Sequence, residues 1–496
     1  MVLNRNIKKE CCEFFGSFLG SWKFLREFVI SLELNNLEVY FHSRLLASVA
    51  LNLFALWMQI IFISFCKWVA YMEDQNPWWV NEVHDKYIEW KESEIKWMPS
   101  FVELVEVEPF SLNFVIGPRQ IGKTTAIMVF IHDVLLRRRD PRSIFYYPCD
   151  EVVDYEELGE ILDDYYNYKQ SVRIKSSVIF LDEITFVDEW WRTIKARIDA
   201  GRFKNDVIFI SGSASIELIA GKERFPGRRG NGKDYYLLPL TFQEYSRLVK
   251  KRPLVLQDFS PISIDNLLSA NKVFRKDIRE DFEEYLITGG FPLSIKEYLA
   301  KGRVSSAHKI YLDWLISDIV RAGKNDRLVK DILSQVICAR LNPVSWNSLA
   351  KEVGGVSPHT IRNYIDFLQK LFIVKVLEFV DPGGKVIHRK NKKIHIIDPF
   401  LYDTVARWTR ENATTEQKVE STVMFHLSFF GETYYWRNST EIDIVLKRDQ
   451  DLLGFEVKWG LKPTARKRPI KTIILDRDRI PLFLASLKIR STYKVG

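Results

Sequence analysis

One short motif constrains the fold of this chain more than any other feature. Residues 117–124 read GPRQIGKT, which matches the pattern G-x-x-x-x-G-K-[ST] at every position. The apolar run LNFVI (112–116) precedes the motif, and a pattern that predicts a helix over 123–136 follows it. A strand, a glycine-bounded loop and a helix in this order predict a phosphate-binding loop in an α/β domain.

Each part of this loop suits a part of a nucleoside triphosphate. Gly117 and Gly122 let the backbone approach the phosphates, so that successive N–H groups point inward. Lys123 is expected to reach the β- and γ-phosphates, and the Thr124 hydroxyl is expected to ligate Mg²⁺. The motif therefore predicts ATP and Mg²⁺ as cofactors. The other predicted nucleotide-binding residues are Pro118, Arg119, Gln120, Ile121 and Thr125.

Two acidic residues end a later apolar run. Further strands are predicted at 143–150, 176–185 and 205–215, and the second of these reads SSVIFLDEIT. In open α/β sheets, ligands bind at the carboxyl ends of the strands. Asp182 is therefore predicted to hold Mg²⁺, and Glu183 to polarise the attacking water. The plainer interpretation is a strand-end cap. A P-loop kinase is disfavoured, because Glu183 beside Asp182 suits activation of water.

Two serines and two arginines are further candidates for this site. Ser211 and Ser213 follow the strand at 205–215, where they act either as a sensor of the γ-phosphate or as turn formers. Arg228 and Arg229 lie in a glycine-rich loop before a predicted fifth strand. They either reach the γ-phosphate of a neighbour in a homo-oligomer or belong to a solvated basic loop.

Length and charge leave room for other domains and partners. The chain has 496 residues, and single cores rarely exceed about 250–300 residues, so two to four domains are expected. The net charge of +8 permits a nucleic-acid partner without requiring one. The five cysteines form no C-x-x-C pair, which argues against structural zinc and fits a cytoplasmic protein.

The first 71 residues form an extension with an uncharged run at 45–66. This run is long enough to cross a bilayer as a helix, which would anchor the protein in a membrane. The alternatives are a buried helix, or an upstream extension of a protein whose translation begins at Met72. Residues 72–245 are expected to form the ATPase core.

Residues 246–335 alternate helical patterns with turns and are expected to form a helical lid behind the core. Residues 336–396 then predict a winged helix-turn-helix, with its second helix starting at Pro358 after the N-cap Ser357. That helix offers His359, Arg362 and Asn363 to a groove of DNA, although winged helices also bind proteins. The predicted wing carries the basic residues Lys385, His388, Arg389, Lys390, Lys392 and Lys393.

Residues 440–459 read as two alternating strands around a polar turn. A turn at Arg448–Asp451 places Lys447 opposite Leu452, and the same register places Asp443 opposite Glu456. Two carboxylates side by side are destabilising unless a cation lies between them, and Mg²⁺ prefers such oxygen ligands. Lys458, one pleat along, would orient or deprotonate a water. The plainer interpretation is an exposed face on which Lys458 balances Glu456 and Glu441.

The ordered set of motifs resembles the archaeal P-loop ATPases of the AAA+ group that carry a C-terminal restriction-endonuclease-like domain. It comprises NPWW, GPRQIGKTT, LDEIT, ISGSAS, GRRG, LPLTFQEY, TGGFP, DPFLYD and FEVKWG. The resemblance implies a D…E-x-K nuclease-type site in residues 397–496, with Glu420 as a fourth member beside Asp443, Glu456 and Lys458. It implies DNA as a partner and two alternatives: a metal-dependent nuclease, or an ATP-dependent switch that does not cut. The basic run 462–471 is a candidate for tracking a phosphate backbone.

Overall fold

The computed structural model describes residues 71–212, 219, 222–260, 264–438, 440–460 and 468–489. The chain divides into two compact units, Met1–His84 and Asp85–Gly496. In the described part of the first unit, the short helix η1 (Pro77–Val80) follows Asn76, whose side-chain amide donates to the carbonyl of Met72. The run 45–66 lies outside the described residues. Among those that are described, no helix has the length and apolar character of a membrane span.

A five-stranded parallel sheet forms the first part of the second unit. Its strands lie in the order β2-β3-β4-β1-β5, so β4 separates β1 from β3. Every residue of β1, β3 and β4 is buried, as expected for a parallel sheet that is covered on both faces. The strands are β1 (Ser111–Ile116), β2 (Ile144–Pro148), β3 (Val178–Asp182), β4 (Val207–Ser211) and β5 (Asp234–Tyr236). They confirm the predicted runs.

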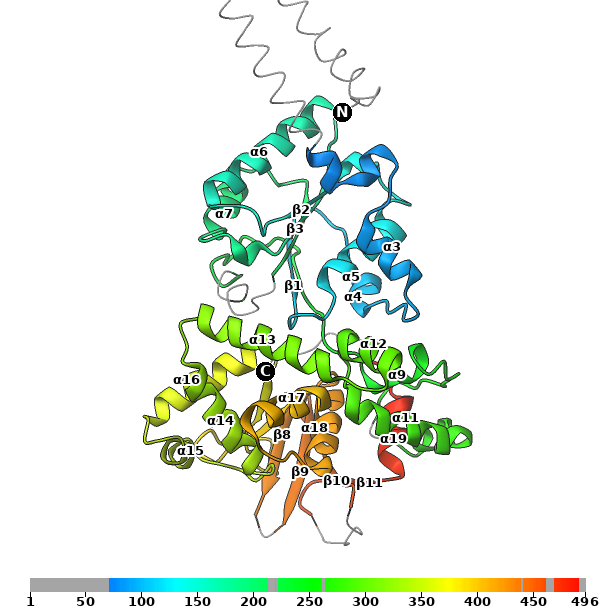
Figure 1. The fold of residues 1–496 in the computed structure, drawn as a ribbon, viewed down its shortest axis with the longest axis vertical. Helices are drawn as coiled ribbons and strands as arrows, with labels where there is room; N and C mark the ends of the chain where they lie inside the picture. Colours follow the sequence, from blue (N-terminus) through cyan, green and yellow to red (C-terminus); the bar gives the residue numbers. More distant parts are fainter. Residues whose placement is uncertain are drawn as a thin grey trace, which may run out of the picture. The chain divides into compact units, whose positions relative to one another are not determined.

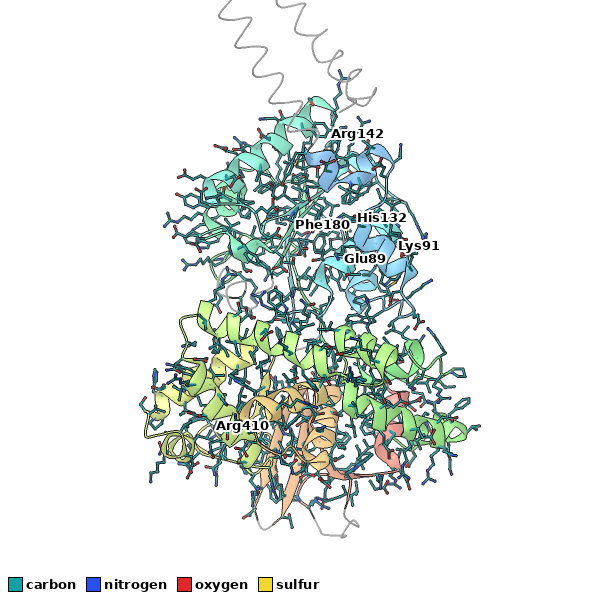
Figure 2. All side chains as sticks on the ribbon, viewed as in Figure 1. Glu89, Lys91, His132, Arg142, Phe180 and Arg410 are labelled. Atoms are coloured by element: carbon teal, nitrogen blue, oxygen red, sulfur yellow. The ribbon has the colours of Figure 1, made fainter. Side chains whose placement is uncertain are left out.

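Helices cover both faces of this sheet (Figure 1). On one face lie α6 (Tyr155–Ser171) and α7 (Trp191–Asp199), and on the other lie α3 (Asp85–Glu92), α4 (Ser100–Leu104) and α5 (Lys123–Phe130). The helix predicted over 123–136 ends as an α-helix at Phe130, and a single π-helical turn, η2 (Ile131–Leu135), continues it. Phe180 lies in the middle of the sheet (Figure 2), where its ring stacks on that of Phe209 at 5.0 Å between centroids.

A run of helices follows the sheet and leads to a small helix-turn-helix segment. Within the latter, α15 and α16 are joined by a turn in which Gly354 and Gly355 have positive φ angles of 89° and 80°. The Ser357 side chain accepts from the N–H of Thr360, as expected for the predicted N-cap. The helices are α9 (Phe242–Leu248), α10 (Ile264–Ala270), α11 (Arg275–Thr288), α12 (Pro292–Lys301), α13 (Ser305–Arg321), α14 (Asp326–Cys338), α15 (Trp346–Glu352) and α16 (Pro358–Lys370).

Two β-structures complete the fold. The strands β6 (Val374–Leu377) and β7 (Lys393–Ile396) pair antiparallel after α16. A four-stranded sheet of order β11-β10-β9-β8 then follows the helices α17 (Pro399–Thr409) and α18 (Thr415–Leu427). Its strands are β8 (Glu432–Arg437), β9 (Glu441–Arg448), β10 (Asp451–Lys458) and β11 (Thr472–Asp476), and α19 (Arg479–Ser486) comes last among the elements described. Arg410, labelled in Figure 2, directly follows α17, and its backbone has the left-handed conformation.

The four-stranded sheet and the helices α9–α11 share one hydrophobic core. Buried Phe282 of α11, Val423 of α18 and Phe455 of β10 belong to it. The motif TGGFP (288–292) fits tightly at this junction, because a Cβ atom on Gly290 would lie 2.1 Å from the carbonyl oxygen of Leu240. The N–H of Gly290 donates to the Asp398 carboxylate, which also caps α17.

Candidate functional site

The predicted phosphate loop lies between β1 and α5. Gly122 has a φ of +90° as the N-cap of α5, a conformation that side chains with a Cβ rarely adopt. A Cβ on Gly117 would lie 2.1 Å from the carbonyl oxygen of Leu237, so this position has no room for a side chain. The two glycines of the motif are therefore required by backbone conformation and by close packing, respectively.

Lys123 is a buried cation inside this loop. Its side chain is 6% exposed, and its ammonium donates to the carbonyl oxygens of Gly117 and Pro118 at 3.1 and 3.0 Å. Burial lowers the pKa of Lys123, while Glu183 and Asp182 oppose that shift. Two neutral carbonyls compensate a buried ammonium less well than an anion would.

Asp182 lies at the end of β3 and accepts hydrogen bonds from three hydroxyl groups. Thr124 Oγ1 donates to Asp182 Oδ2 at 2.6 Å and Tyr146 Oη donates to the same oxygen at 3.1 Å. The Ser211 hydroxyl donates to Asp182 Oδ1. The structure thus brings together the predicted pair Thr124 and Asp182, and it places Ser211 beside them because β4 lies between β1 and β3.

The remaining predicted members of this site have different outcomes. Glu183 directly follows β3 with a φ of +55°, is half-buried, and donates its N–H to Asp182 Oδ1 at 3.1 Å. Ser213 lies outside the described residues. Tyr146 was missed by sequence reasoning, because β2 is a buried strand with adjacent tyrosines and no alternation to show which one faces the site.

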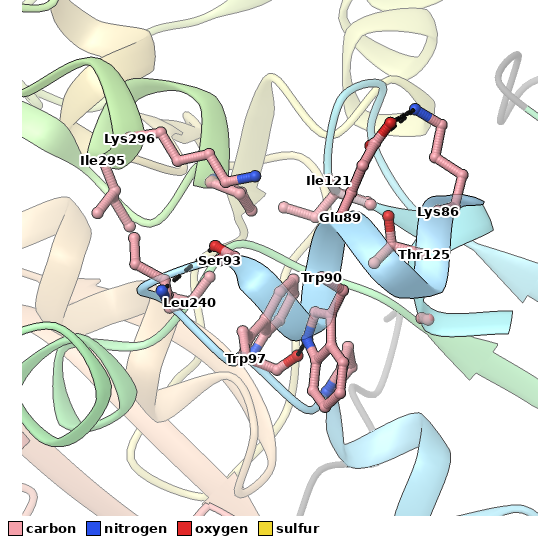
Figure 3. A pocket seen from close by; sticks show the side chains of 15 residues that line it. Lys86, Glu89, Trp90, Ser93, Trp97, Ile121, Thr125, Leu240, Ile295 and Lys296 are labelled. Atoms are coloured by element: carbon pink, nitrogen blue, oxygen red, sulfur yellow. Dashed lines mark hydrogen bonds and ion pairs between the residues drawn. The ribbon is translucent and has the colours of Figure 1, made fainter. Parts of the chain in front are cut away.

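A pocket opens beside the phosphate loop (Figure 3). Ile121, Gly122 and Thr125 form the wall on the loop side, and Trp90 of α3 also lines the pocket. The indole N–H of Trp90 donates to the carbonyl of Trp97 at 2.8 Å, which fixes the segment between them. The opposite wall comes from α12, with Pro292, Ile295 and Lys296.

Helix α13 contacts the site from the helical part of the chain. Arg119 of the loop donates to both oxygens of Asp318 at 2.7 Å, and its guanidinium lies 4.9 Å from the ring centre of Trp314. One turn further on, Arg321 donates to the carbonyl of Thr185, just after Glu183. Asp318 and Arg321 were not predicted, because no local motif marks them and they lie about two hundred residues from the loop in sequence.

Arg228 and Arg229 lie towards the amino end of β1, away from the phosphate loop. Arg229 donates to the carbonyl of Leu112 in β1 and to Asp234 at 2.7 Å, while Arg228 forms an ion pair with Asp199 at 2.6 Å. The phosphate loop follows the carboxyl end of β1, so neither arginine reaches the site of its own chain. Their role in a neighbouring subunit stays a prediction.

The helix-turn-helix segment exposes the residues predicted to face a groove. His359, Arg362 and Asn363 of α16 are exposed, and so are Lys385, His388, Arg389 and Lys390 of the predicted wing. Lys393 is the first residue of β7 and Lys392 precedes it, so both lie at the strand pair predicted as the wing. Lys392 and Lys393 are only 4% and 1% exposed, however, and the expectation that they add to its basic surface is wrong. The Lys392 ammonium bonds the carbonyls of His388 and Lys390, and Lys393 points into the C-terminal sheet.

The C-terminal hairpin has the predicted register. Leu452 pairs with Lys447 and Phe455 with Ile444, and the N–H of Val457 donates to Asp443 Oδ2 at 2.8 Å. Ile442, Ile444, Phe455 and Val457 are buried on one face. The other face carries Glu441, Asp443 and Glu456, and Glu420 of α18 shares the contact of Lys393 with Glu441 and Asp443. We call these four carboxylates the acidic cluster. Asp443 and Glu456 are 7% and 6% exposed, so the alternative of a solvent-exposed face is wrong.

Protein cations surround the acidic cluster. Lys393 lies 2.6 Å from Glu420 and 3.0 Å from Glu441, and Lys458 lies 3.1 Å from Glu456. Arg468 also pairs with Glu456. Burial raises the pKa of Glu420 to about 7, although Lys393 opposes this shift. Burial alone would lower the pKa of Lys393, but Glu420, Asp443 and Glu441 raise it above its usual value.

The acidic cluster does not fit the Mg²⁺ ion that the family resemblance implies. Within the described part of the chain, no three or more His, Cys, Asp or Glu side chains are arranged to hold a metal ion. Arg468, the member of the predicted basic run 462–471 that ion-pairs with Glu456, has a side chain only 7% exposed. Its prediction as a residue that tracks a phosphate backbone is therefore wrong, while 462–467 lie outside the described residues.

Comparison with known proteins supports the nucleotide-binding core. Residues 110–246 match the family model described as AAA domain, and residues 279–412 match a Domain of unknown function (DUF8612). An uncharacterized protein of Haemophilus influenzae is 23% identical over 367 residues, which cover 71% of this chain and 83% of the relative. The first match and the site geometry agree that this part of the chain is an AAA-type P-loop ATPase core.

Several solved structures show a partial likeness to this chain. The Walker-type ATPase of Pyrococcus abyssi matches with a TM-score of 0.38 and 14% identity, covering 59% of this chain and 90% of that one. The ORC2 protein of Aeropyrum pernix, solved as ADPNP–ADP complexes, matches with a TM-score of 0.35 and 14% identity, covering 60% of this chain and 88% of that one. The AMPPCP-bound DnaA of Aquifex aeolicus has a TM-score of 0.27 and 16% identity, covering 59% and 91%.

Proposed function

We propose that this protein is a Mg²⁺-dependent ATPase whose nucleotide state is transmitted to a DNA-binding part of the chain. The observation that carries the ATPase is the contact between Thr124, at the start of α5, and Asp182, at the end of β3. A hydroxyl and a carboxylate are brought together at the end of a glycine-bounded loop, which is the arrangement that P-loop ATPases use for magnesium.

The residues of this site fit MgATP. Thr124 Oγ1 and the Asp182 carboxylate are hard oxygen donors and would hold Mg²⁺, which when bound neutralises charge on the β- and γ-phosphate oxygens. Lys123 would exchange its two carbonyl partners for phosphate oxygens, which compensate its charge better. Glu183 would orient and deprotonate the attacking water, and Ser211 would report the state of the γ-phosphate through Asp182.

The pocket beside the loop fits the base and sugar of the nucleotide. It adjoins Gly122 and Thr125, so a nucleotide with its phosphates in the loop extends directly into it. Trp90, Ile121 and Ile295 supply apolar surface, and Lys296 adds a polar group at the rim, as is typical of ligand pockets (Figure 3).

Replacing Lys123 tests the ATPase. Lys123→Ala removes the cation that faces the phosphates, and we expect ATP turnover by the purified full chain to fall at least about a hundredfold. The matched control is Lys204→Ala, since Lys204 is exposed in the loop before β4 and should leave turnover unchanged. Turnover by Lys123→Ala at the parental rate would contradict the proposal.

The exposed basic surface of α16 and the wing supports DNA as the partner. Arg362 and Asn363 lie on the helix that would enter a groove, and Lys385, Arg389 and Lys390 flank it on the wing. We expect fluorescence anisotropy to show duplex binding that weakens with salt. The double variant Arg362→Ala/Lys390→Ala should bind at least about tenfold more weakly, while Lys204→Ala should bind normally. Unchanged binding by the double variant would place the interface elsewhere.

Two forms of this proposal differ in what the C-terminal sheet does. In one form, ATP binding or hydrolysis activates the acidic cluster to cut DNA. In the other form, the chain is an ATP-dependent switch that binds DNA or a protein without cutting. The position of Lys458 beside both Asp443 and Glu456, at 3.9 and 3.1 Å, supports the first form. The cations that already surround these carboxylates support the second.

A further inference from the structure

We infer that the ammonium of Lys393 takes the place of a divalent cation in the acidic cluster, so that the C-terminal sheet is held together without a metal and does not cut DNA. The inference concerns a site that is separate from the phosphate loop, and it does not depend on ATP hydrolysis. It identifies Lys393 as the internal counter-ion of the hairpin carboxylates.

Lys393 contacts oxygens of three acidic residues. Its ammonium donates hydrogen bonds to Glu441 Oε1 at 3.0 Å and to the carbonyl oxygen of Asp443 at 3.5 Å. It also forms ion pairs with Glu420 Oε1 at 2.6 Å and with Asp443 Oδ1 at 3.7 Å. A lysine has three N–H donors and no acceptor, so acidic oxygens are the partners that suit it. The side chain is 1% exposed, and a lysine is stable at such depth only when carboxylates compensate its charge.

Protein cations or N–H groups already lie beside the carboxylates that would ligate a metal. Asp443 Oδ2 accepts the N–H of Val457 at 2.8 Å and lies 3.9 Å from Lys458. Glu456 is paired with Lys458 and with Arg468. A divalent cation between Asp443 and Glu456 would have to displace one of these cations or lie beside it. Close approach of like charges at a buried site is strongly unfavourable.

Protein cations also balance the charge of the acidic cluster. Its four carboxylates form ion pairs with Lys393, Lys458, Arg468 and Arg437, the last of which lies 3.7 Å from Glu441. A divalent ion added to this set would leave it with a net positive charge. Divalent cations are held by carboxylate oxygens whose negative charge attracts them, and that charge is cancelled here.

The counter-ion comes from a different part of the chain. Lys393 is the first residue of β7, and β7 pairs with β6 directly after α16. Glu420 comes from α18, and Glu441 and Asp443 come from β9. The ammonium therefore links the helix-turn-helix segment to the C-terminal sheet. A bound metal ion can dissociate, so the same link made by a metal would depend on the metal concentration.

Iron-directed cleavage of the protein backbone tests this inference without relying on enzymatic activity. Fe²⁺ substitutes for Mg²⁺ at oxygen sites, and with ascorbate and peroxide it generates radicals that cut the chain next to the bound ion. We expect the wild-type full chain to show no cuts above background around 441–458. In Lys393→Ala, which removes the ammonium from the oxygens of Glu420, Glu441 and Asp443, we expect cuts there. Cuts in the wild type, or none in a folded Lys393→Ala, would overturn the inference.

A second variant guards against misfolding of Lys393→Ala. Lys393→Met keeps an unbranched apolar side chain in the same space, removes the ammonium and retains all four carboxylates. We expect it to fold, as judged by circular dichroism, and to show the same cuts, because the carboxylates then lack this counter-ion. A folded Lys393→Met without cuts would overturn the inference as well. In a DNA nicking assay with Mg²⁺ or Mn²⁺ and ATP, wild type and Asp443→Asn should be indistinguishable, and nicking lost in the variant would also overturn it.

Discussion

At the scale of single residues, the nucleotide site centres on Asp182. Its carboxylate is 1% exposed and accepts from the hydroxyls of Thr124, Tyr146 and Ser211, which come from three different elements. A buried carboxylate with this many donors has a fixed orientation. In the proposed mechanism this orientation matters, because a shift of the residue that would hold Mg²⁺ would move the γ-phosphate relative to the attacking water.

Tyr146→Phe should separate positioning from binding. The change removes the 3.1 Å hydrogen bond to Asp182 Oδ2 and keeps the ring. A hydrogen bond to a charged group contributes about 1.5–3 kcal/mol, so we expect kcat to fall about tenfold while the KM for ATP changes little. Steady-state ATP hydrolysis measures both. Tyr155→Phe is the control, because that hydroxyl contacts only exposed Glu156 among the bonds described. A raised KM with normal kcat would assign Tyr146 to binding.

Some residues of the site could be predicted from the sequence, and others could not. Lys123, Thr124 and Asp182 were predicted because a glycine-bounded loop and an acidic strand end are local patterns. Tyr146, Asp318 and Arg321 were not, because their roles arise only when distant elements pack together. For the same reason the sequence did not indicate that Lys393 lies in the acidic cluster. Lys393 belongs to β7, fifty residues before Asp443.

At the scale of elements, α13 links the nucleotide site to the rest of the chain. Asp318 and Trp314 bind Arg119 of the phosphate loop, and Arg321 binds the carbonyl of Thr185 and lies 4.9 Å from the ring centre of Phe186. The helix thus touches both the loop before α5 and the segment after β3. A movement of either segment on nucleotide binding would displace α13.

Asp318→Asn should loosen this link. The Arg119–Asp318 pair is largely buried, with side chains 10% and 8% exposed, and breaking such a pair by removing one charge costs about 3–5 kcal/mol. We expect lower stability to urea and faster amide exchange across 305–321. Asp313→Asn on the same helix is exposed and serves as the control. Wild-type exchange rates in Asp318→Asn would show that α13 is held by other contacts.

The C-terminal hairpin shows what strand patterns can and cannot reveal. The register and the apolar face followed from the period of two along β9 and β10, and both are confirmed. The burial of the polar face did not follow, because it depends on α18 and β7 covering that face. Alternation identifies two faces of a strand but does not say whether the polar one meets water or other elements.

At the scale of the whole molecule, two buried histidines join distant parts of the chain. His426 of α18 accepts the N–H of Phe242 at the start of α9 through Nε2 at 2.8 Å, and its Nδ1 contacts the carbonyl of Thr422. His308 of α13 lies 2.7 Å from the hydroxyl of Thr404 and stacks on Phe400. Burial lowers the pKa of each ring to about 4. Both rings are therefore neutral in the folded protein at neutral pH.

These histidines predict that acid destabilises the fold. An unfolded histidine has a pKa of about 6.5, so the unfolded state takes up protons first as the pH falls towards 4. Stability should be fully present above pH 6.5 and decline between about 6.5 and 4, as measured by urea unfolding at several pH values. His426→Gln should reduce the slope in this window, whereas the exposed His359→Gln should keep it. An unchanged slope in His426→Gln would assign the acid sensitivity to other groups.

The three hydroxyls that surround Asp182 have a consequence for an ATPase that has released its ligands. The carboxylate would still accept hydrogen bonds from these side chains, so it would not be buried without donors. We therefore expect the empty protein to keep this part of its fold and to rebind a nucleotide without refolding.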